Sequence, residues 1–100
     1  MLDKAARMDI DEAGDALLLA GEIDSFTAPV LAERLAESGA VTVVDLSGVT
    51  FLDSSGLRVL VEAHRIRAET GGSLRLRAPS TNVQHLLEIS GLLDHFDVVD

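Results

Sequence analysis

A short β-branched segment near the middle of the chain, VTVVDL at residues 41–46, constrains the fold most strongly. It is bounded by Gly39 and Gly48 and is typical of a strand buried on both faces of a sheet. Helical patterns flank it, one over residues 28–38 and a longer one after Asp53, which Gly71 and Gly72 end. A buried strand between two helices favours parallel pairing, so the sequence predicts an α/β fold.

The remaining segments complete the predicted order strand, strand, helix, strand, helix, strand, helix, strand. Residues 8–23 read as a β-hairpin whose second strand ends near Gly21, and Thr27 or Ser25 is expected to cap the helix that follows. SLRLRA alternates like a strand, STNVQHLLEIS reads as a short helix capped by Ser80 or Thr81, and FDVV as an edge strand. We predict a single domain over residues 1–100, with a small mixed sheet packed with helices.

Polar residues follow the carboxyl ends of the predicted parallel strands. The segments GEIDS, DLSGVTFLDSSG and APS are expected to lie along one edge of the sheet, where open α/β folds place their sites. Asp24, Asp53, Ser54 and Ser55 are therefore expected to lie close together.

The helix predicted after Asp53 has more than one apolar stripe. Its charged face is expected to carry the pairs Arg58 with Glu62 and Arg65 with Glu69, at four-residue spacing. A second apolar row lies away from the main apolar face and consists of Gly56, Val59, Ala63 and Ile66. We favour packing of this row on a neighbouring helix, and the alternative is that part of it is free for a partner.

Charge and composition exclude several classes of protein. The formal net charge of −9 repels nucleic acid and anionic membrane surfaces, so neither is expected as a partner. The chain has no cysteine, which suits a reducing compartment, and no apolar run of signal-peptide or membrane-spanning type. We expect a cytoplasmic protein.

Enzymatic and cofactor motifs are also missing. There is no G-x-S-x-G nucleophile elbow, no G-K-[ST] phosphate loop and no recognisable spacing of metal ligands around the three histidines. His64 lies on an apolar helical face and is expected to be a satisfied core residue. We expect no catalytic residue, no metal and no cofactor.

The junction at Asp53 has two compatible interpretations. Asp53 is expected to cap the helix, with its carboxylate accepting from the N–H of Ser55 or Gly56. A helix start can also hold a phosphate on a serine hydroxyl. Asp53 can thus cap the helix while Ser55 is modified, and the residue types alone favour the plain cap.

Three segments resemble one family. VVDLSGVTFLDSSGLRVLVEAHR is similar to the signature of STAS domains of the anti-sigma factor antagonist type, in which D-L-S leads through D-S-S-G-L into a helix. LAGEIDSFTAPVLAERL and ISGLLDHFDV resemble the first turn and helix and the closing segment of that family. The resemblance covers the chain from about Leu17 to Val99.

This resemblance implies a bacterial partner-switching regulator. In that family an anti-sigma factor that is also a serine kinase phosphorylates the second serine, here Ser55, and a serine phosphatase removes the phosphate. The unphosphorylated antagonist binds the anti-sigma factor and frees the sigma factor. The matching partner-binding positions are Asp24, Asp53, Ser54, Gly56, Leu57 and Arg58.

The sequence departs from the family at two positions. Arg58 replaces a frequent glycine, three residues beyond Ser55, and could pair with a phosphate or with an acidic partner. Val30 lies where a polar residue is usual.

Three other functions remain open from the sequence. A STAS subunit of a transporter or lipid-transport complex would share the fold but needs no phosphorylatable serine, so Ser54 and Ser55 argue against it. A stressosome-like scaffold would carry a further sensor domain. An esterase using Ser, His and Asp is the least favoured alternative.

Overall fold

Five strands form one mixed sheet in the computed structural model, which describes residues 8–92 and 95–100. The strands lie in chain order, and they are β1 (Met8–Ala13), β2 (Ala16–Ile23), β3 (Val43–Leu52), β4 (Arg75–Arg77) and β5 (Asp97–Val99). Strand β1 pairs antiparallel with β2, and the other neighbouring strands pair in parallel. The predicted α/β class, the small mixed sheet and the final edge strand are confirmed.

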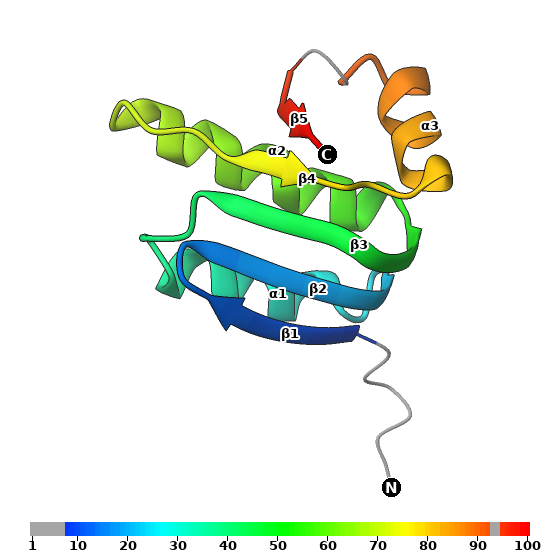
Figure 1. Ribbon diagram of the computed structural model, residues 1–100, viewed down its shortest axis with the longest axis horizontal. Coiled ribbons are helices and arrows are strands. Elements are labelled where there is room, and N and C mark those ends of the chain that lie inside the picture. The colour runs from blue at the N-terminus through cyan, green and yellow to red at the C-terminus, as the bar shows by residue number, and fades with distance from the viewer. Residues whose placement is uncertain (1–7, 93–94) are drawn as a thin grey trace, which may run out of the picture.

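Helices connect the parallel strands. These are α1 (Ala28–Glu37), α2 (Ser54–Glu69) and α3 (Thr81–Ile89). Helices α1 and α2 lie side by side on one face of the sheet, and α3 lies beside the end of β3 (Figure 1). Their apolar stripes cover the sheet and form one core with residues such as Leu17, Val44 and Leu60, whose side chains are fully buried.

Local signals set several element ends as predicted. Gly71, with φ +83°, follows the last turn of α2, and the N–H of Gly72 donates to the Arg67 carbonyl. Ser80 caps α3 by accepting from the N–H of Val83 at 3.3 Å. His64 is half-buried, and its Nδ1 accepts from the N–H of Leu74, which confirms a satisfied histidine.

Two predicted boundaries were wrong. The central strand does not end before Gly48 but continues to Leu52, because the backbone of Gly48 lies against Ala20 of β2. A Cβ atom at position 48 would lie 2.9 Å from the Ala20 Cβ, next to an irregularity in the β2–β3 register. Strand β2 likewise continues beyond Gly21 to Ile23.

Thr27 is the N-cap residue of α1, as one of the two predicted candidates, but its side chain does not cap the helix in the expected way. The Thr27 side chain makes no capping bond, and instead the Asp24 Oδ1 accepts from the N–H groups of Phe26 and Thr27 at 2.9 and 3.1 Å. The Ala28 N–H donates to the Asp24 carbonyl, so the chain already turns helically one turn earlier than the pattern indicated. Pro29 lies in the first turn of α1, as expected.

Two arginines, Arg67 and Arg77, connect separate elements of the fold. The Arg67 guanidinium donates to the carbonyls of Leu35, Ser38 and Val41, which joins α2 to the end of α1 and the loop before β3. Burial of this guanidinium lowers the pKa of Arg67 from its ordinary value. Arg77 of β4 pairs with Asp45 of β3 at 2.7 Å.

Candidate functional site

The candidate site is the edge of the sheet where β2 and β3 end. The Asp53 N–H donates to the Ile23 carbonyl at 3.1 Å, which joins the last residue of β2 to the residue that follows β3. Asp24 follows Ile23 directly, so this bond brings the two carboxyl-bearing turns together. The juxtaposition of Asp24 with Asp53, Ser54 and Ser55 is as the parallel topology predicted.

Asp53 is the N-cap of α2. Its Oδ1 accepts from the N–H groups of Ser55 and Gly56, at 2.8 and 3.2 Å, while its extended backbone leads the chain out of β3. Both predicted acceptor contacts are therefore present in one cap. A negative carboxylate at this end is also favoured by the helix dipole.

The two serines differ in exposure. Ser54 is exposed and Ser55 is partly buried. Within the described residues, neither serine hydroxyl makes a hydrogen bond. The contact between Ser55 and Asp53 uses the backbone N–H of Ser55. Both side chains therefore present an oxygen that the fold does not use.

Gly56 and Leu57 lie beneath this edge. Both are buried, and a Cβ atom at position 56 would lie 2.5 Å from Ile23 Cγ2 and 2.5 Å from Leu52 Cδ1. The absence of a side chain at Gly56 lets the first turn of α2 press against the ends of β2 and β3. These two residues hold the serines in place from below.

Asp24 and Thr27 fix the neighbouring turn. Thr27 is the buried polar residue of the described chain, at 4% exposure, and its Oγ1 accepts from the Asp24 N–H while lying 3.0 Å from the Glu22 carbonyl, to which it donates. With the bonds that Asp24 accepts, this makes a reciprocal cap of the capping-box type. Asp24 is thus a structural element of the edge as well as a candidate binding residue.

Sequence reasoning missed an exposed apolar surface around the site. Phe26, in the turn after Asp24, is 77% exposed, and Phe51, two residues before Asp53, is 48% exposed. Val30 of α1 is also exposed, at 55%. The signal was available, since two of the three phenylalanines flank the polar segments of the edge. Large apolar side chains are typically buried in a domain, and a contiguous group of exposed ones is typical of an interaction site.

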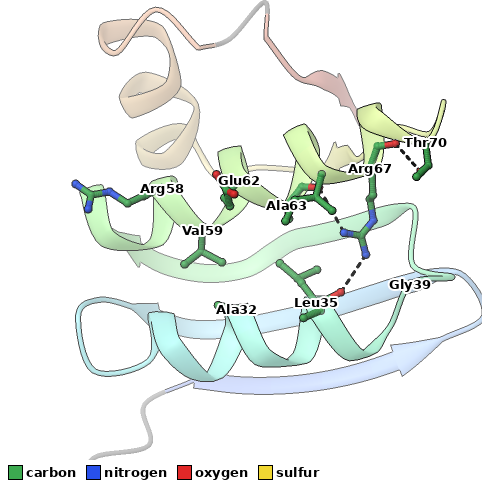
Figure 2. A pocket seen from close by; sticks show the side chains of 11 residues that line it. Ala32, Leu35, Gly39, Arg58, Val59, Glu62, Ala63, Arg67 and Thr70 are labelled. Carbon is green, nitrogen blue, oxygen red and sulfur yellow. Dashed lines mark hydrogen bonds between the residues drawn. The ribbon is translucent and has the colours of Figure 1, made fainter.

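Within residues 8–92 and 95–100, no cluster of three or more His, Asp or Glu could hold a metal ion. In that part of the chain, no helix combines the length and the apolar character needed to cross a bilayer. An apolar groove of about 580 Å³ lies between α1 and α2, lined in part by Leu35, Val59 and Ala63 (Figure 2).

The second apolar row of α2 is partly packed and partly exposed. Gly56 and Ala63 are buried, whereas Ile66 remains 49% exposed. The row therefore packs partly on the sheet and α1, and its remaining surface lines the groove.

The comparison with known proteins fits this geometry. A family model described as "Mlab, STAS domain" matches residues 6–100. The chain belongs to the STAS domain family. The predicted resemblance is confirmed.

Relatives among curated proteins are named antagonists. The chain is 42% identical over 83 residues to the anti-sigma-B factor antagonist of Bacillus subtilis (strain 168), covering 80% of this chain and 76% of that protein. It is 36% identical over 86 residues to the protein of the same name from Listeria monocytogenes, covering 82% and 75%.

Solved STAS structures share the fold. The unphosphorylated form of the anti-sigma factor antagonist SpoIIAA matches with a TM-score of 0.73 at 20% identity, over 93% of this chain and 88% of that one. An anti-sigma factor antagonist from Mycobacterium paratuberculosis matches with a TM-score of 0.75 at 23% identity, over 99% and 90%.

Proposed function

We propose that this STAS domain is an anti-sigma factor antagonist whose binding is switched off by phosphorylation of Ser55. The unphosphorylated form binds an anti-sigma factor that is also a serine kinase, and the sigma factor is released. A serine phosphatase restores the binding form. The names of the curated relatives support the antagonist function over a transporter or lipid-transport subunit.

The observation that carries the proposal is the position of Ser55. It lies on the first turn of α2, at an edge built from two polar turns, with a hydroxyl that no recorded hydrogen bond engages. Exposed apolar side chains at Phe26 and Phe51 flank this edge. A modifiable hydroxyl beside an apolar surface is what a phosphorylation-controlled protein interface requires.

The phosphate would act through the interface and not through the fold. It adds roughly −1.5 to −2 charges beside two carboxylates, those of Asp53 and Asp24. A partner covering the edge would have to desolvate this dianion, and unpaired buried charge is costly. Since a change of about 1.4 kcal/mol alters affinity tenfold, this local penalty suffices to release the partner.

The proposed binding residues have different roles. Asp24, Asp53, Ser54 and Arg58 present polar atoms at or near the edge, whereas Gly56 and Leu57 are buried and would contribute by positioning α2. We propose that the protein works as a binding module and kinase substrate without catalytic activity of its own, in the cytoplasm.

The test uses the purified anti-sigma kinase, phosphopeptide mapping and calorimetry. We expect the label on Ser55, constitutive binding by Ser55→Ala, and binding at least tenfold weaker for protein phosphorylated at Ser55. Ser54→Ala is the matched control and should still be phosphorylated and released. A label confined to Ser54, or equal affinities of the two forms of Ser55, would contradict the proposal.

A second pair of variants separates binding from folding at Asp24. Asp24→Asn keeps an oxygen for the Phe26 and Thr27 N–H groups, whereas Asp24→Ala removes it. If Asp24 contacts the partner through its charge, both variants bind more weakly, although only Asp24→Ala loses stability, by about 1 kcal/mol. Unchanged affinity of Asp24→Asn would remove Asp24 from the binding surface.

A further inference from the structure

Arg58 is the unengaged arginine of the described chain. Arg34, Arg65, Arg75 and Arg77 each pair with a carboxylate, and Arg67 donates to backbone carbonyls. For Arg58, no contact of either kind is present in residues 8–92 and 95–100. The Arg58 side chain is exposed, so its guanidinium is available to a group that approaches α2.

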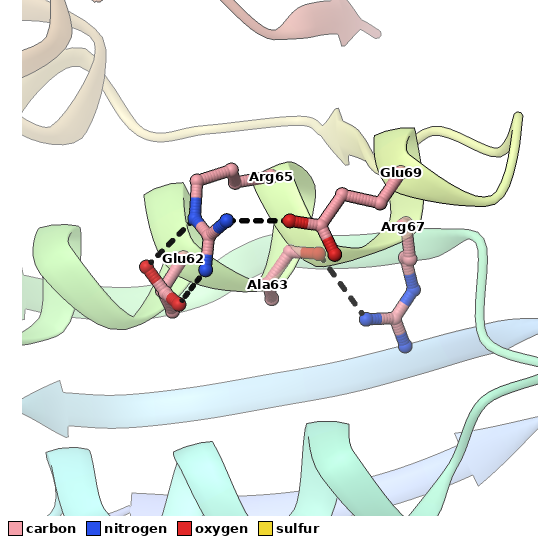
Figure 3. Close-up of polar contacts among 5 residues, drawn as sticks. All are labelled: Glu62, Ala63, Arg65, Arg67 and Glu69. Carbon is pink, nitrogen blue, oxygen red and sulfur yellow. Dashed lines mark hydrogen bonds and ion pairs between the residues drawn. The ribbon is translucent and has the colours of Figure 1, made fainter.

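The carboxylate predicted to pair with Arg58 is occupied by another residue. Glu62 accepts from Arg65 through both oxygens, with Nε and Nη2 at 3.2 and 2.5 Å, and Arg65 also donates to Glu69 at 2.6 Å (Figure 3). The predicted Arg65–Glu69 pair is confirmed, and the predicted Arg58–Glu62 pair was wrong. The bidentate geometry with Arg65 explains this choice of partner.

Arg58 is directed toward the helix start. Figure 2 shows its side chain extending away from Val59, toward the N-terminal end of α2. Helical side chains lean toward the N-terminus, and residues three apart have Cβ atoms about 5–6 Å from one another. Ser55 lies three residues before Arg58, so the guanidinium can reach a group attached to the Ser55 oxygen.

The other groups around Ser55 would not neutralise an attached phosphate. Asp53 already accepts from the Ser55 and Gly56 N–H groups, and its charge, like that of Asp24, repels an anion. Helix α3 contributes His85, which lines a hollow beside Phe51 and Leu52. Among the described residues, Arg58 is therefore the cation placed to offset the charge.

We infer that Arg58 binds the phosphoryl group of phosphorylated Ser55 and holds it along the first turns of α2, away from Asp24. The inference rests on the proposed function, because it concerns the phosphorylated form. An arginine can donate two parallel N–H bonds to a phosphate, whereas a lysine supplies a point charge. Arg58 thus defines where the dianion that blocks the partner is located.

Phosphoserine installed at position 55 during synthesis allows a test without the kinase. The second pKa of the phosphate is measured from the ³¹P chemical shift between pH 4 and 8. A neighbouring cation favours the dianion, so Arg58→Gln should raise this pKa by about half a unit or more, and Arg58→Lys by less. Arg65→Gln is the matched control on the same helix, and His85→Gln is the control for the imidazole that α3 contributes.

The possible results separate the inference from the proposed function. A phosphate pKa that Arg58→Gln leaves unchanged, or that Arg65→Gln raises by the same amount, overturns the role of Arg58. A kinase that ignores Ser55 overturns the proposed function but leaves the ³¹P result standing. Unchanged melting temperatures of the unphosphorylated variants confirm that the comparison concerns the phosphate alone.

Discussion

Gly56 lies directly against Ile23, and a Cβ atom added at position 56 would meet the Cγ2 atom of Ile23 at 2.5 Å. Leu52 Cδ1 would lie equally close. The start of α2 therefore rests on the ends of β2 and β3 with no room for a side chain. This contact fixes the position of Ser54 and Ser55 relative to the sheet.

Gly56→Ala is accordingly expected to destabilise the domain, although alanine favours helix. Both clashing atoms belong to buried side chains, and overpacking of this kind costs about 1–3 kcal/mol. Gly39→Ala is the matched control, because nothing lies within 4 Å of a Cβ atom there. Urea unfolding measures the stability of both variants. Equal midpoints would show that Ile23 and Leu52 can move aside at little cost.

Removal of the α2 cap separates the charge of Asp53 from its hydrogen bonds. Asp53→Ala leaves the Ser55 and Gly56 N–H groups without their acceptor and should lower the free energy of unfolding by about 1 kcal/mol. Asp53→Asn keeps an acceptor oxygen and should lose less. Thermal unfolding of both variants checks this, and equal losses would mean that the charge, acting on the helix dipole, is the larger contribution.

Local signals allowed much of the fold to be predicted. The Asp53 cap, the glycine stop at Gly71 and the Ser80 cap each depend on residues within one turn, so type and spacing were sufficient. The shared edge of Asp24 and Asp53 followed from parallel topology, which itself followed from the alternation of strands and helices.

The features missed from the sequence depend on contacts between distant segments. Strand β3 continues through Gly48 because the backbone there lies against Ala20 of the neighbouring strand β2. The sequence shows only the glycine, which is typical of a strand end. The exposure of Phe26 and Phe51 was missed because apolar residues are expected to be buried, although both residues flank the polar segments of the edge. Glu62 had two arginines within reach, and spacing alone did not decide between them.

Arg67 is expected to stabilise the domain far more than a surface arginine. Arg67→Met removes the donor for the carbonyls of Leu35, Ser38 and Val41, and should cost about 2 kcal/mol. The control is Arg65→Met, two residues away, which loses only exposed ion pairs and should cost less than about 1 kcal/mol. Denaturant unfolding compares them, and a similar loss in both variants would show that the carbonyls are readily solvated.

The last prediction concerns acid stability and Asp45. Burial raises the pKa of the Asp45 carboxyl, but hydrogen bonds from Ser47 and Arg77 and the charge of Arg77 lower it by more, to below its ordinary value of 3.8. The unfolded chain therefore binds the proton more readily than the folded one. The stability that Asp45 contributes is fully present above pH 3.8 and is lost as the pH falls through the lower folded value.

Asp45→Asn should consequently be less stable than the parent near neutral pH, and the difference should shrink as the solution is acidified toward pH 3. Asp97→Asn makes the same change in net charge at an exposed ion pair with Arg75, and should change stability little. Urea midpoints measured from pH 7 to pH 3 test this directly. A gap between parent and Asp45→Asn that stays constant down to pH 3 would show that Asp45 stabilises the strands through packing or neutral hydrogen bonds, because only an ionised carboxylate loses its contribution on protonation.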